Sequence, residues 1–312
     1  MATPVLEVSG LTKQYGQFTA VDNISFSIKE GEIVGLLGPN GAGKTTTIQM
    51  LLGLTAPSSG TISYFGKDLR FHREEILGRI NYVSAFAGMQ TRVTARENLQ
   101  LFAGLYEIDD WEKKVASLSA ALGITHKLDD LYWFLSSGER ARINLVKAFL
   151  NDPELILMDE PTASLDPEIV HVVLDLIFTM RKQQKIAILY TSHNMGEVTR
   201  ICDRVMFLHH GSIIATDTPL GLSRRAGEAT LRLTFDDELK RVVRYLKQKK
   251  YAYVLEQPHI MAITVTEQDI AKVLFGFAKA KVWITDIEIE KPDLEDVFLA
   301  VAKGGADALS ES

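Results

Sequence analysis

A glycine-rich loop follows directly after an apolar run near the amino end of the chain. Residues 38–46 read GPNGAGKTT, and residues 33–37 before them read IVGLL. Glycines at this spacing let successive backbone N–H groups curl around a polyphosphate, with a helix N-terminus aimed at the same charge. The order of strand, loop and Lys-Thr favours this interpretation over an ordinary tight turn. We therefore predict a nucleoside triphosphate site formed by Gly38, Pro39, Asn40, Gly41, Ala42, Gly43, Lys44, Thr45 and Thr46.

Three side chains at this site have specific predicted roles. The Lys44 ammonium is expected to reach the β- and γ-phosphates, and the Thr45 hydroxyl to bind Mg²⁺. Two carboxylates, Asp159 and Glu160, end the apolar run 155–158. Asp159 is placed to hold Mg²⁺ through its water shell, and Glu160 is placed to orient an attacking water. Alone this acid pair would suggest only a capped strand end, but beside a phosphate loop it indicates hydrolysis.

A second anion-binding pattern lies in the middle of the chain. Residues 135–139 read LSSGE and stand just before a segment with helical periodicity. The Ser136 hydroxyl, the Gly138 backbone N–H and a helix N-terminus would together bind an anion. The chain therefore carries two separate patterns for binding phosphate.

Composition bounds the class of protein. The 312 residues are 46% hydrophobic and 24% charged, with a net charge of −6, as in an ordinary globular protein. No long block of Lys or Arg supports a nucleic-acid partner. The single cysteine, Cys202, excludes an internal disulfide and suits a reducing compartment. We see no secretory signal and no apolar run near the ~18 residues that cross a bilayer.

Periodicity predicts an α/β domain over residues 1–220. A helix follows the phosphate loop over 45–54. A helical insertion spans about 86–150, and a helix within it begins at the capping box Thr94–Glu97. Another helix starts at Asp166-Pro167 and runs to about Arg181. Strands are expected at 5–8, 24–28, 33–37, 61–65, 80–83, 155–159, 186–190, 205–208 and 213–215.

The pattern of predicted elements changes after a polar linker, 219–227. Strands are predicted at 229–235, 251–255, 260–265 and 282–289, and helices at 238–247 and 268–279. This β-α-β-β-α-β order is that of a ferredoxin-like split βαβ unit. We predict an accessory domain over 228–303, closed by a helix at 294–302, and a flexible tail over 304–312.

These motifs together resemble those of the ATP-binding-cassette (ABC) ATPases. Residues 135–139 are similar to the family's LSGGQ signature, and 164–167 (SLDP) to its D-loop. The resemblance implies that Asp166 belongs to the nucleotide site, that His193 in Thr191-Ser192-His193 contacts the γ-phosphate, and that Tyr15 stacks on adenine. It spans roughly residues 5–215, with every motif in order.

Two positions depart from the family pattern. The signature reads Ser-Ser-Gly-Glu, but Ser136 and Gly138, the groups that would donate to phosphate, remain. The family's glutamine after a strand like 80–84 is replaced by Ala85, which places its usual contacts to Mg²⁺ and the membrane partner in doubt. Water could complete the magnesium shell. Gln90 lies too far along the chain to be taken as a substitute.

The carboxyl-terminal residues narrow the resemblance. Residues 291–299 (KPDLEDVFL) are similar to the ending of ATP-binding subunits in ABC-2-type exporters. The implied fold is a P-loop NTPase cassette of the α/β class, with a mixed sheet core, an antiparallel β subdomain and a helical subdomain, followed by a small α+β ferredoxin-like domain.

This resemblance implies an ATP-hydrolysing subunit, with ATP and Mg²⁺ as cofactors, that powers export. Its expected partners are a membrane permease on a separate chain and a second ATP-binding subunit, with a homodimer favoured. It would lie in the cytoplasm, peripheral to the inner face of the membrane. Each ATP would bind between Lys44 of one subunit and Ser136 of another.

Three other interpretations remain open at this point. A soluble ABC ATPase would usually have a long coiled-coil insertion or two cassettes, and a P-loop kinase or GTPase would lack the Ser136–Gly138 site. A non-hydrolysing regulatory module would be expected to have lost Glu160 or His193, and both are present. Nothing in the sequence specifies the cargo.

Overall fold

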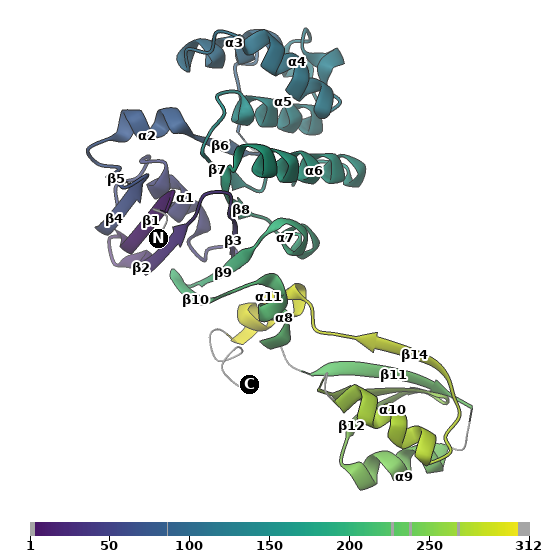
Figure 1. Ribbon diagram of the computed structural model, residues 1–312. Helices are drawn as coiled ribbons and strands as arrows, with labels where there is room; N and C mark the ends of the chain where they lie inside the picture. Colours follow the sequence, from purple (N-terminus) through teal and green to yellow (C-terminus); the bar gives the residue numbers. More distant parts are fainter. Residues whose placement is uncertain (1–3, 86, 226–227, 237–238, 267–268, 305–312) are drawn as a thin grey trace. The chain divides into compact units, whose positions relative to one another are not determined.

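The computed structural model describes residues 4–85, 87–225, 228–236, 239–266 and 269–304. The chain divides into two compact units, Met1–Pro219 and Leu220–Ser312, and Figure 1 shows the elements of each. Of the tail predicted at 304–312, all but the first residue lies outside the described residues. No helix in the described ranges is both long and apolar enough to span a bilayer.

A six-stranded sheet forms the centre of the first unit. Its strand order is β10-β9-β3-β8-β7-β6. Neighbours from β9 to β6 pair in parallel, and β10 pairs antiparallel with β9 at one edge. The sheet is mixed, as predicted. Its strands are β3 (Ile33–Leu37), β6 (Ile80–Ser84), β7 (Leu155–Asp159), β8 (Ala187–Thr191), β9 (Arg204–His209) and β10 (Ser212–Asp217).

The strands that carry the predicted motifs lie in the middle of this sheet. Every residue of β3 and β8 is buried, and in β7 only the last residue, Asp159, is partly exposed. Continuous apolar runs of this kind are typical of parallel strands covered on both faces. Because the strands are parallel, the segments that follow β3, β7 and β8 emerge at one edge, where open α/β sheets bind ligands.

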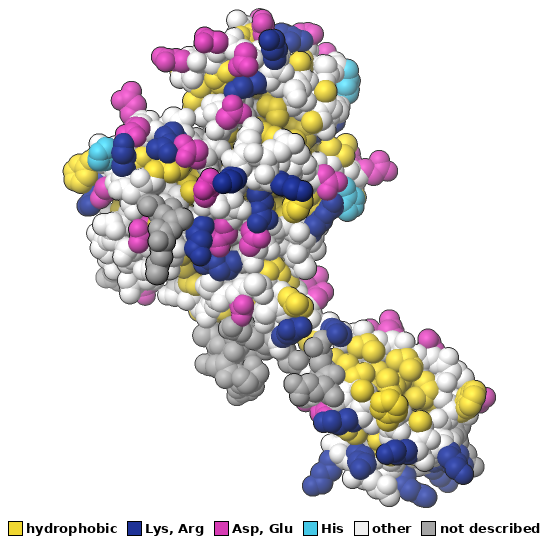
Figure 2. Space-filling model, viewed as in Figure 1, with side chains coloured by type: hydrophobic (Ala, Val, Ile, Leu, Met, Phe, Trp, Pro, Cys, Tyr) yellow, Lys and Arg dark blue, Asp and Glu magenta, His cyan; other side chains and the backbone are white. Residues whose placement is uncertain are grey.

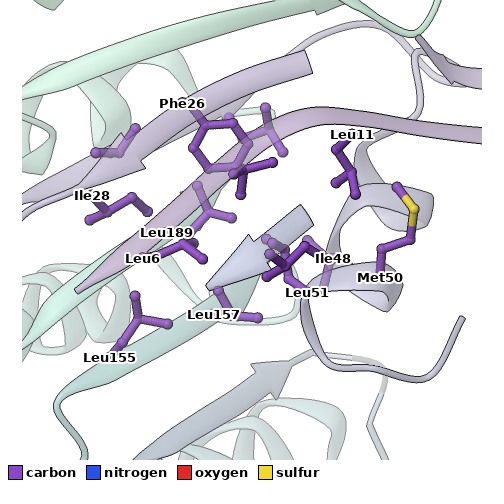
Figure 3. Packing of buried hydrophobic residues seen from close by; sticks show 14 of the residues in the cluster. Leu6, Leu11, Phe26, Ile28, Ile48, Met50, Leu51, Leu155, Leu157 and Leu189 are labelled. Carbon is purple, nitrogen blue, oxygen red and sulfur yellow. The ribbon is translucent and has the colours of Figure 1, made fainter. Parts of the chain in front are cut away.

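An antiparallel sheet packs against this centre. Its order is β2-β1-β4-β5, and Figure 3 shows side chains from β1 and β2 packed with others from α1, β7 and β8. This packing holds the helix that follows the phosphate loop between the two sheets. The strands are β1 (Leu6–Tyr15), β2 (Phe18–Ile28), β4 (Ser59–Tyr64) and β5 (Lys67–Asp68).

The helices of the first unit include a cluster inserted between β6 and β7. In this insertion the capping box at Thr94 is present, with Glu97 N donating to Thr94 Oγ1 at 3.1 Å. The sequence did not predict α2. The helices are α1 (Lys44–Leu51), α2 (Arg73–Arg79), α3 (Ala95–Leu105), α4 (Trp111–Ala121), α5 (Ser137–Phe149), α6 (Pro167–Gln184) and α7 (Met195–Ile201), with 3₁₀ turns at Thr125–Lys127 and Tyr132–Phe134.

The second unit contains a four-stranded antiparallel sheet of order β12-β13-β11-β14. With a helix after its first and third strands, this is the ferredoxin-like order predicted from the sequence. The segment predicted as a polar linker instead forms a helix, α8, in which Leu222 is fully buried. The elements are α8 (Pro219–Arg225), β11 (Ala229–Phe235), α9 (Leu239–Lys249), β12 (Ala252–Gln257), β13 (Ile260–Val265), α10 (Ile270–Lys279), β14 (Ile284–Glu290) and α11 (Leu294–Gly304).

Candidate functional site

The phosphate loop connects β3 to α1 and passes close to neighbouring backbone. A Cβ atom at Gly38 would lie 2.1 Å from the carbonyl oxygen of Leu208, and one at Gly43 would lie 2.4 Å from that of Ala20. Gly43 also has φ of 108°, in the region that favours glycine. Only glycine fits at these positions, so the loop shape is fixed by the sequence.

Gly43 is the N-cap of α1, and no described side chain caps this helix end. The N-terminal N–H groups and the positive end of the helix dipole therefore face the loop. The Lys44 ammonium donates to the carbonyls of Gly38 at 2.5 Å and Pro39 at 3.2 Å. Burial lowers the pKa of Lys44, while the nearby carboxylates of Glu160 and Asp159 act to raise it.

The carboxylates, a threonine and a histidine meet at the ends of β7 and β8. The register of the ladder places Asp159 beside Thr191, and the Thr191 hydroxyl donates to Asp159 Oδ1 at 2.8 Å. The Glu160 carboxylate lies 2.7 Å from His193 Nε2. The structure thus brings Lys44, Asp159, Glu160 and His193 into one cluster. We call this cluster, together with residues 38–46, the phosphate half-site.

The backbone at Glu160 is strained. Its φ is 51°, a left-handed conformation that costs free energy for a non-glycine residue. The backbone N–H of Glu160 donates to both the carbonyl and the hydroxyl oxygen of Thr191, at 3.1 Å each. These bonds to β8 hold the turn so that the carboxylate points toward His193.

A buried carboxylate that the sequence analysis did not identify supports this cluster. Glu197, on α7, is 6% exposed. Its Oε2 atom accepts hydrogen bonds from Thr162 and Tyr190 at 2.7 Å each and from Ser192 at 3.1 Å. Glu197 therefore joins the segment after Glu160 to the segment that carries His193. The available sequence signal was the N-cap Asn194, whose side chain accepts from Glu197 N.

The signature residues form the N-terminus of α5, closed by a capping box. Ser136 Oγ accepts from Glu139 N at 3.2 Å, and Glu139 Oε2 accepts from Ser136 N at 2.8 Å. That backbone bond from Ser136 lowers the pKa of Glu139, so this carboxyl is ionised at neutral pH. Lys127 Nζ lies 3.5 Å from it. We call residues 136–139 the signature half-site.

The Ser136 hydroxyl can still donate a hydrogen bond although its oxygen caps α5. A hydroxyl has one proton to donate and two lone pairs, and here it accepts only one bond. The side chain is exposed, so its proton can be donated outward. A Cβ atom at Gly138 would lie 3.2 Å from Ser164 O, which keeps this helix end close to residues 164–167.

Among the described residues, Asp166 and Tyr15 form no hydrogen bond or ion pair with the phosphate half-site. Asp166 is the N-cap of α6 with Pro167 after it, as the sequence indicated, but its side chain makes no capping bond and is exposed. Tyr15 ends β1 and is half exposed, with Lys13 Nζ 5.0 Å from its ring centroid. The predicted contact of Tyr15 with adenine stays a prediction.

The segment after β6, where Ala85 replaces the family's glutamine, is held by two asparagines. Asn98 on α3 accepts from Gln90 N and donates to Gln90 O, at 3.0 and 2.9 Å. Asn144 on α5 donates to Ala87 O at 2.6 Å. The Gln90 backbone is thus used in anchoring this segment to the helical insertion.

The two half-sites are not joined within one chain. Among the described residues, no hydrogen bond or ion pair links Ser136 or Gly138 to residues 38–46, Glu160 or His193. The phosphate half-site is a connected cluster, whereas the signature half-site is exposed at the N-terminus of α5. The arrangement offers two separate surfaces for binding phosphate oxygens.

The residues present fit a magnesium ion bound mainly through phosphate oxygens. Among the residues that the structure describes, no group of three or more His, Cys, Asp or Glu side chains could hold a metal ion alone. The Thr45 hydroxyl is exposed and Asp159 is partly exposed. Mg²⁺ commonly takes one or two protein oxygens together with waters and substrate phosphates.

Comparisons of the sequence identify similar proteins over most of the chain. Residues 21–163 match the ABC transporter family model. The bacitracin transport ATP-binding protein BcrA of Bacillus licheniformis is 32% identical over 96% of this chain and 98% of its own length. The Nod factor export ATP-binding protein I of Ralstonia nicotianae is 38% identical over 70% of this chain and 68% of its own.

Solved structures show the same fold. One described as an ATP binding subunit of an ABC transporter is 30% identical, with a TM-score of 0.67 over 71% of this chain and 92% of that chain. The cbiO1 protein of Clostridium perfringens, described as part of an ABC transporter complex, is 26% identical. Its TM-score is 0.63 over 80% of this chain and 96% of that chain.

Proposed function

The chain belongs to the ABC transporter family as an exporter-type, ATP-hydrolysing subunit, and we propose that two copies close on two ATP molecules to drive a separate membrane permease. Subunits of this family dimerise and work with membrane permeases. For this chain, the finer proposal is a homodimer in which each ATP lies between the phosphate half-site of one copy and the signature half-site of the other. The observation that most directly supports this proposal is that the two half-sites are separate within one chain.

Each residue of the phosphate half-site has a proposed task. The loop N–H groups and the end of α1 bind the phosphates, and the Lys44 ammonium offsets their charge. Thr45 and Asp159 would hold Mg²⁺, which supplies charge stabilisation on the β- and γ-phosphates when bound. Glu160 orients the attacking water and accepts its proton, while His193, 2.7 Å from Glu160, contacts the γ-phosphate.

The signature half-site would bind the γ-phosphate of the partner's nucleotide. Ser136 donates its hydroxyl proton, and Gly138 offers a backbone N–H at the positive end of α5. Because the ionised Glu139 lies at the same helix end, this surface attracts phosphate less than an LSGGQ sequence would. Hydrolysis removes the group that both half-sites share, so the two copies would separate afterwards.

The helical insertion offers a surface for the permease. On α3, Leu101 and Leu105 are 54% and 69% exposed, and together with Glu97, Gln100 and Gly104 they line a shallow groove. Large apolar side chains exposed side by side often mark a protein contact. Through Asn98, the same helix also holds the segment after β6. Docked there, the chain would lie peripheral to the inner face of the membrane.

Mixing two inactive variants tests the shared site. Lys44→Ala and Ser136→Ala chains are each expected to lose ATP turnover. In a mixed head-to-tail dimer, one site carries both substitutions and the other carries none. Random pairing makes half of the dimers mixed, so the mixture should regain about a quarter of wild-type turnover.

The control is a mixture of Lys44→Ala with Lys44→Ala/Ser136→Ala chains, in which no intact site can form. Turnover in the test mixture no higher than in this control would show that both groups act within one chain. Phosphate release measured at several total concentrations checks the result, because a shared site requires association.

A further inference from the structure

The two helices on the sheet of the second unit present a basic and apolar outer face. Residues 239–250 contain six Lys or Arg and no Asp or Glu, and on α9 they are exposed, while Val242 and Leu246 are buried. Among the described residues, no acidic side chain forms an ion pair with Lys240, Arg244 or Lys247. These charges are directed at solvent.

Helix α10 lies beside α9 on the same face of the sheet. The rings of Tyr245 and Phe277 are 4.7 Å apart between centroids. A Cβ atom at Gly276 would lie 1.6 Å from the Tyr245 hydroxyl oxygen, so the end of the tyrosine side chain packs directly over this glycine of α10. Buried residues of both helices share one core with β11 and β13. The two helices thus form one rigid layer.

The outer face of α10 carries exposed apolar side chains beside two exposed lysines, Lys272 and Lys279, of which Lys272 pairs with Asp269. Ala271 and Ala278 are exposed there. Phe275 is 71% exposed. Figure 2 shows this face of the second unit, with hydrophobic side chains gathered over one area and Lys and Arg along its edge. We call Lys240, Arg244, Lys247 and Phe275 the helical face patch.

The opposite face of the sheet is acidic. Arg232 alternates with Leu231 and Leu233, which point into the core, so its side chain projects from the other face. There it forms ion pairs with Glu256, Glu288 and Glu290. One cation therefore meets three carboxylates, and this unit has a basic helical face and an acidic sheet face.

We propose that the helical face patch adsorbs directly to anionic phospholipid headgroups of the membrane, independently of any contact with a permease. Basic residues on one side of a helical layer attract anionic lipid, and the exposed Phe275 side chain enters the headgroup boundary. Long Lys and Arg stems allow the charges to stay at the phosphate level while this ring inserts. The acidic sheet face, repelled by the same surface, sets the orientation.

Charge and shape favour anionic lipid over two other possible ligands of the helical face patch. A second copy would place two basic helices against each other, and like charges repel. A single-stranded nucleic acid could stack a base on Phe275, but a single ring in the patch gives no platform on which successive bases stack. Both alternatives make different predictions from the lipid proposal and are distinguished below.

Vesicle sedimentation of the full chain tests the proposal. With phosphatidylcholine vesicles containing phosphatidylglycerol, the wild-type chain should bind at low salt and dissociate as salt is raised. With phosphatidylcholine alone, binding should be weak. The Lys240→Glu/Arg244→Glu/Lys247→Glu variant should bind the anionic vesicles about 100-fold more weakly or worse, because each lost basic residue removes a large factor in affinity.

The matched control reverses three exposed lysines of the first unit. Lys29→Glu/Lys113→Glu/Lys182→Glu has the same net charge, and its vesicle binding should stay within a few-fold of wild type. A Phe275→Ser variant should still bind anionic vesicles at low salt, but the part of the binding that persists at high salt should be lost. ATP turnover without vesicles shows whether each variant is folded, and it separates this proposal from the shared-site proposal.

Three results would overturn the proposal. The first is equal vesicle binding by the patch variant and its control. The second is failure of the wild-type chain to bind anionic vesicles at low salt. The third is loss in the patch variant of binding to a homopolymeric RNA, with vesicle binding unchanged, which would assign the surface to nucleic acid. Salt-sensitive binding lost only in the patch variant supports lipid.

Discussion

The phosphate half-site and the signature half-site differ in how their polar groups are satisfied. At the first, Thr191 and His193 contact the two carboxylates, and α1 begins without a side-chain cap. At the second, Ser136 and Glu139 bond to each other at the start of α5. The first half-site has carboxylates and an imidazole close enough to exchange a proton, whereas the carboxylate of the second, Glu139, is held in its capping box. We therefore expect the first surface to carry the chemistry and the second to recognise the substrate.

The strongest test of this division is Glu160→Gln. The amide keeps the size of the side chain but cannot accept a proton from water, so turnover should fall about 10²–10⁴-fold while ATP binding remains. The uncleaved γ-phosphate should then hold two copies together, which light scattering would detect with ATP present. Glu112→Gln, an exposed site on α4, is the matched control. A variant that bound ATP and stayed monomeric, even with its permease, would contradict the shared site.

A second test removes the buried support of the phosphate half-site. Glu197→Ala leaves the hydroxyls of Thr162, Tyr190 and Ser192 without their acceptor, which should cost roughly 3 kcal/mol of stability. Turnover should fall as well, since the segments bearing Glu160 and His193 are no longer joined.

The conservative change Glu197→Gln keeps one carbonyl oxygen as an acceptor. It should recover most of the turnover and part of the stability, measured by denaturant unfolding and phosphate release. Equal losses in both variants would show that the negative charge, rather than the position of the acceptor, is what matters.

The helix of the signature half-site is attached to the central sheet by a partly buried lysine. Lys147 on α5 donates to Tyr82 O at 2.9 Å. Burial lowers its pKa from an ordinary 10.5 to about 8. Between these values the folded chain binds fewer protons than the unfolded chain, so this residue makes stability rise with pH. Below about pH 8 both states are protonated, and the slope vanishes.

Comparing the wild-type chain with Lys147→Met isolates this contribution. From about pH 8 to 10.5 the wild type should gain stability relative to the variant by about 1.4 kcal/mol per pH unit. Urea unfolding of both chains at a series of pH values measures the difference, because all other titrating groups are shared. A difference that did not change with pH would mean that the ammonium is well solvated.

The contrast between the half-sites also explains what the sequence could predict. Residues 38–46 and Asp159-Glu160 are contiguous strings next to apolar runs, so local patterns place them at the edge of a parallel sheet. The support from Glu197 depends on three hydroxyls from two other segments, and no local pattern reveals such a contact. Likewise, α8 forms where a polar linker was predicted, because the burial of Leu222 outweighs local composition.

In the second unit, too, local sequence patterns could not predict how residues from different elements are arranged, here over a whole surface. The β-α-β-β-α-β order of elements along the chain predicted the ferredoxin-like unit, but the net charge of the whole chain conceals the charge pattern of this unit. The basic residues at 240–250 are interspersed with apolar ones, and the acidic residues that contrast with them come from other strands. Only folding places the two sets on opposite faces.

The smallest expected effect tests the signature half-site alone. Glu139→Gln keeps the capping box, because glutamine also accepts from Ser136 N, but removes a negative charge from the helix end that would meet phosphate. ATP-dependent dimerisation should tighten by a factor of about 2–5. Lys127→Gln, which removes the cation beside Glu139, should weaken it to a similar extent. Sedimentation of both variants in the Glu160→Gln background measures the change, and shifts of the same sign would mean that charge at this helix end does not control closure.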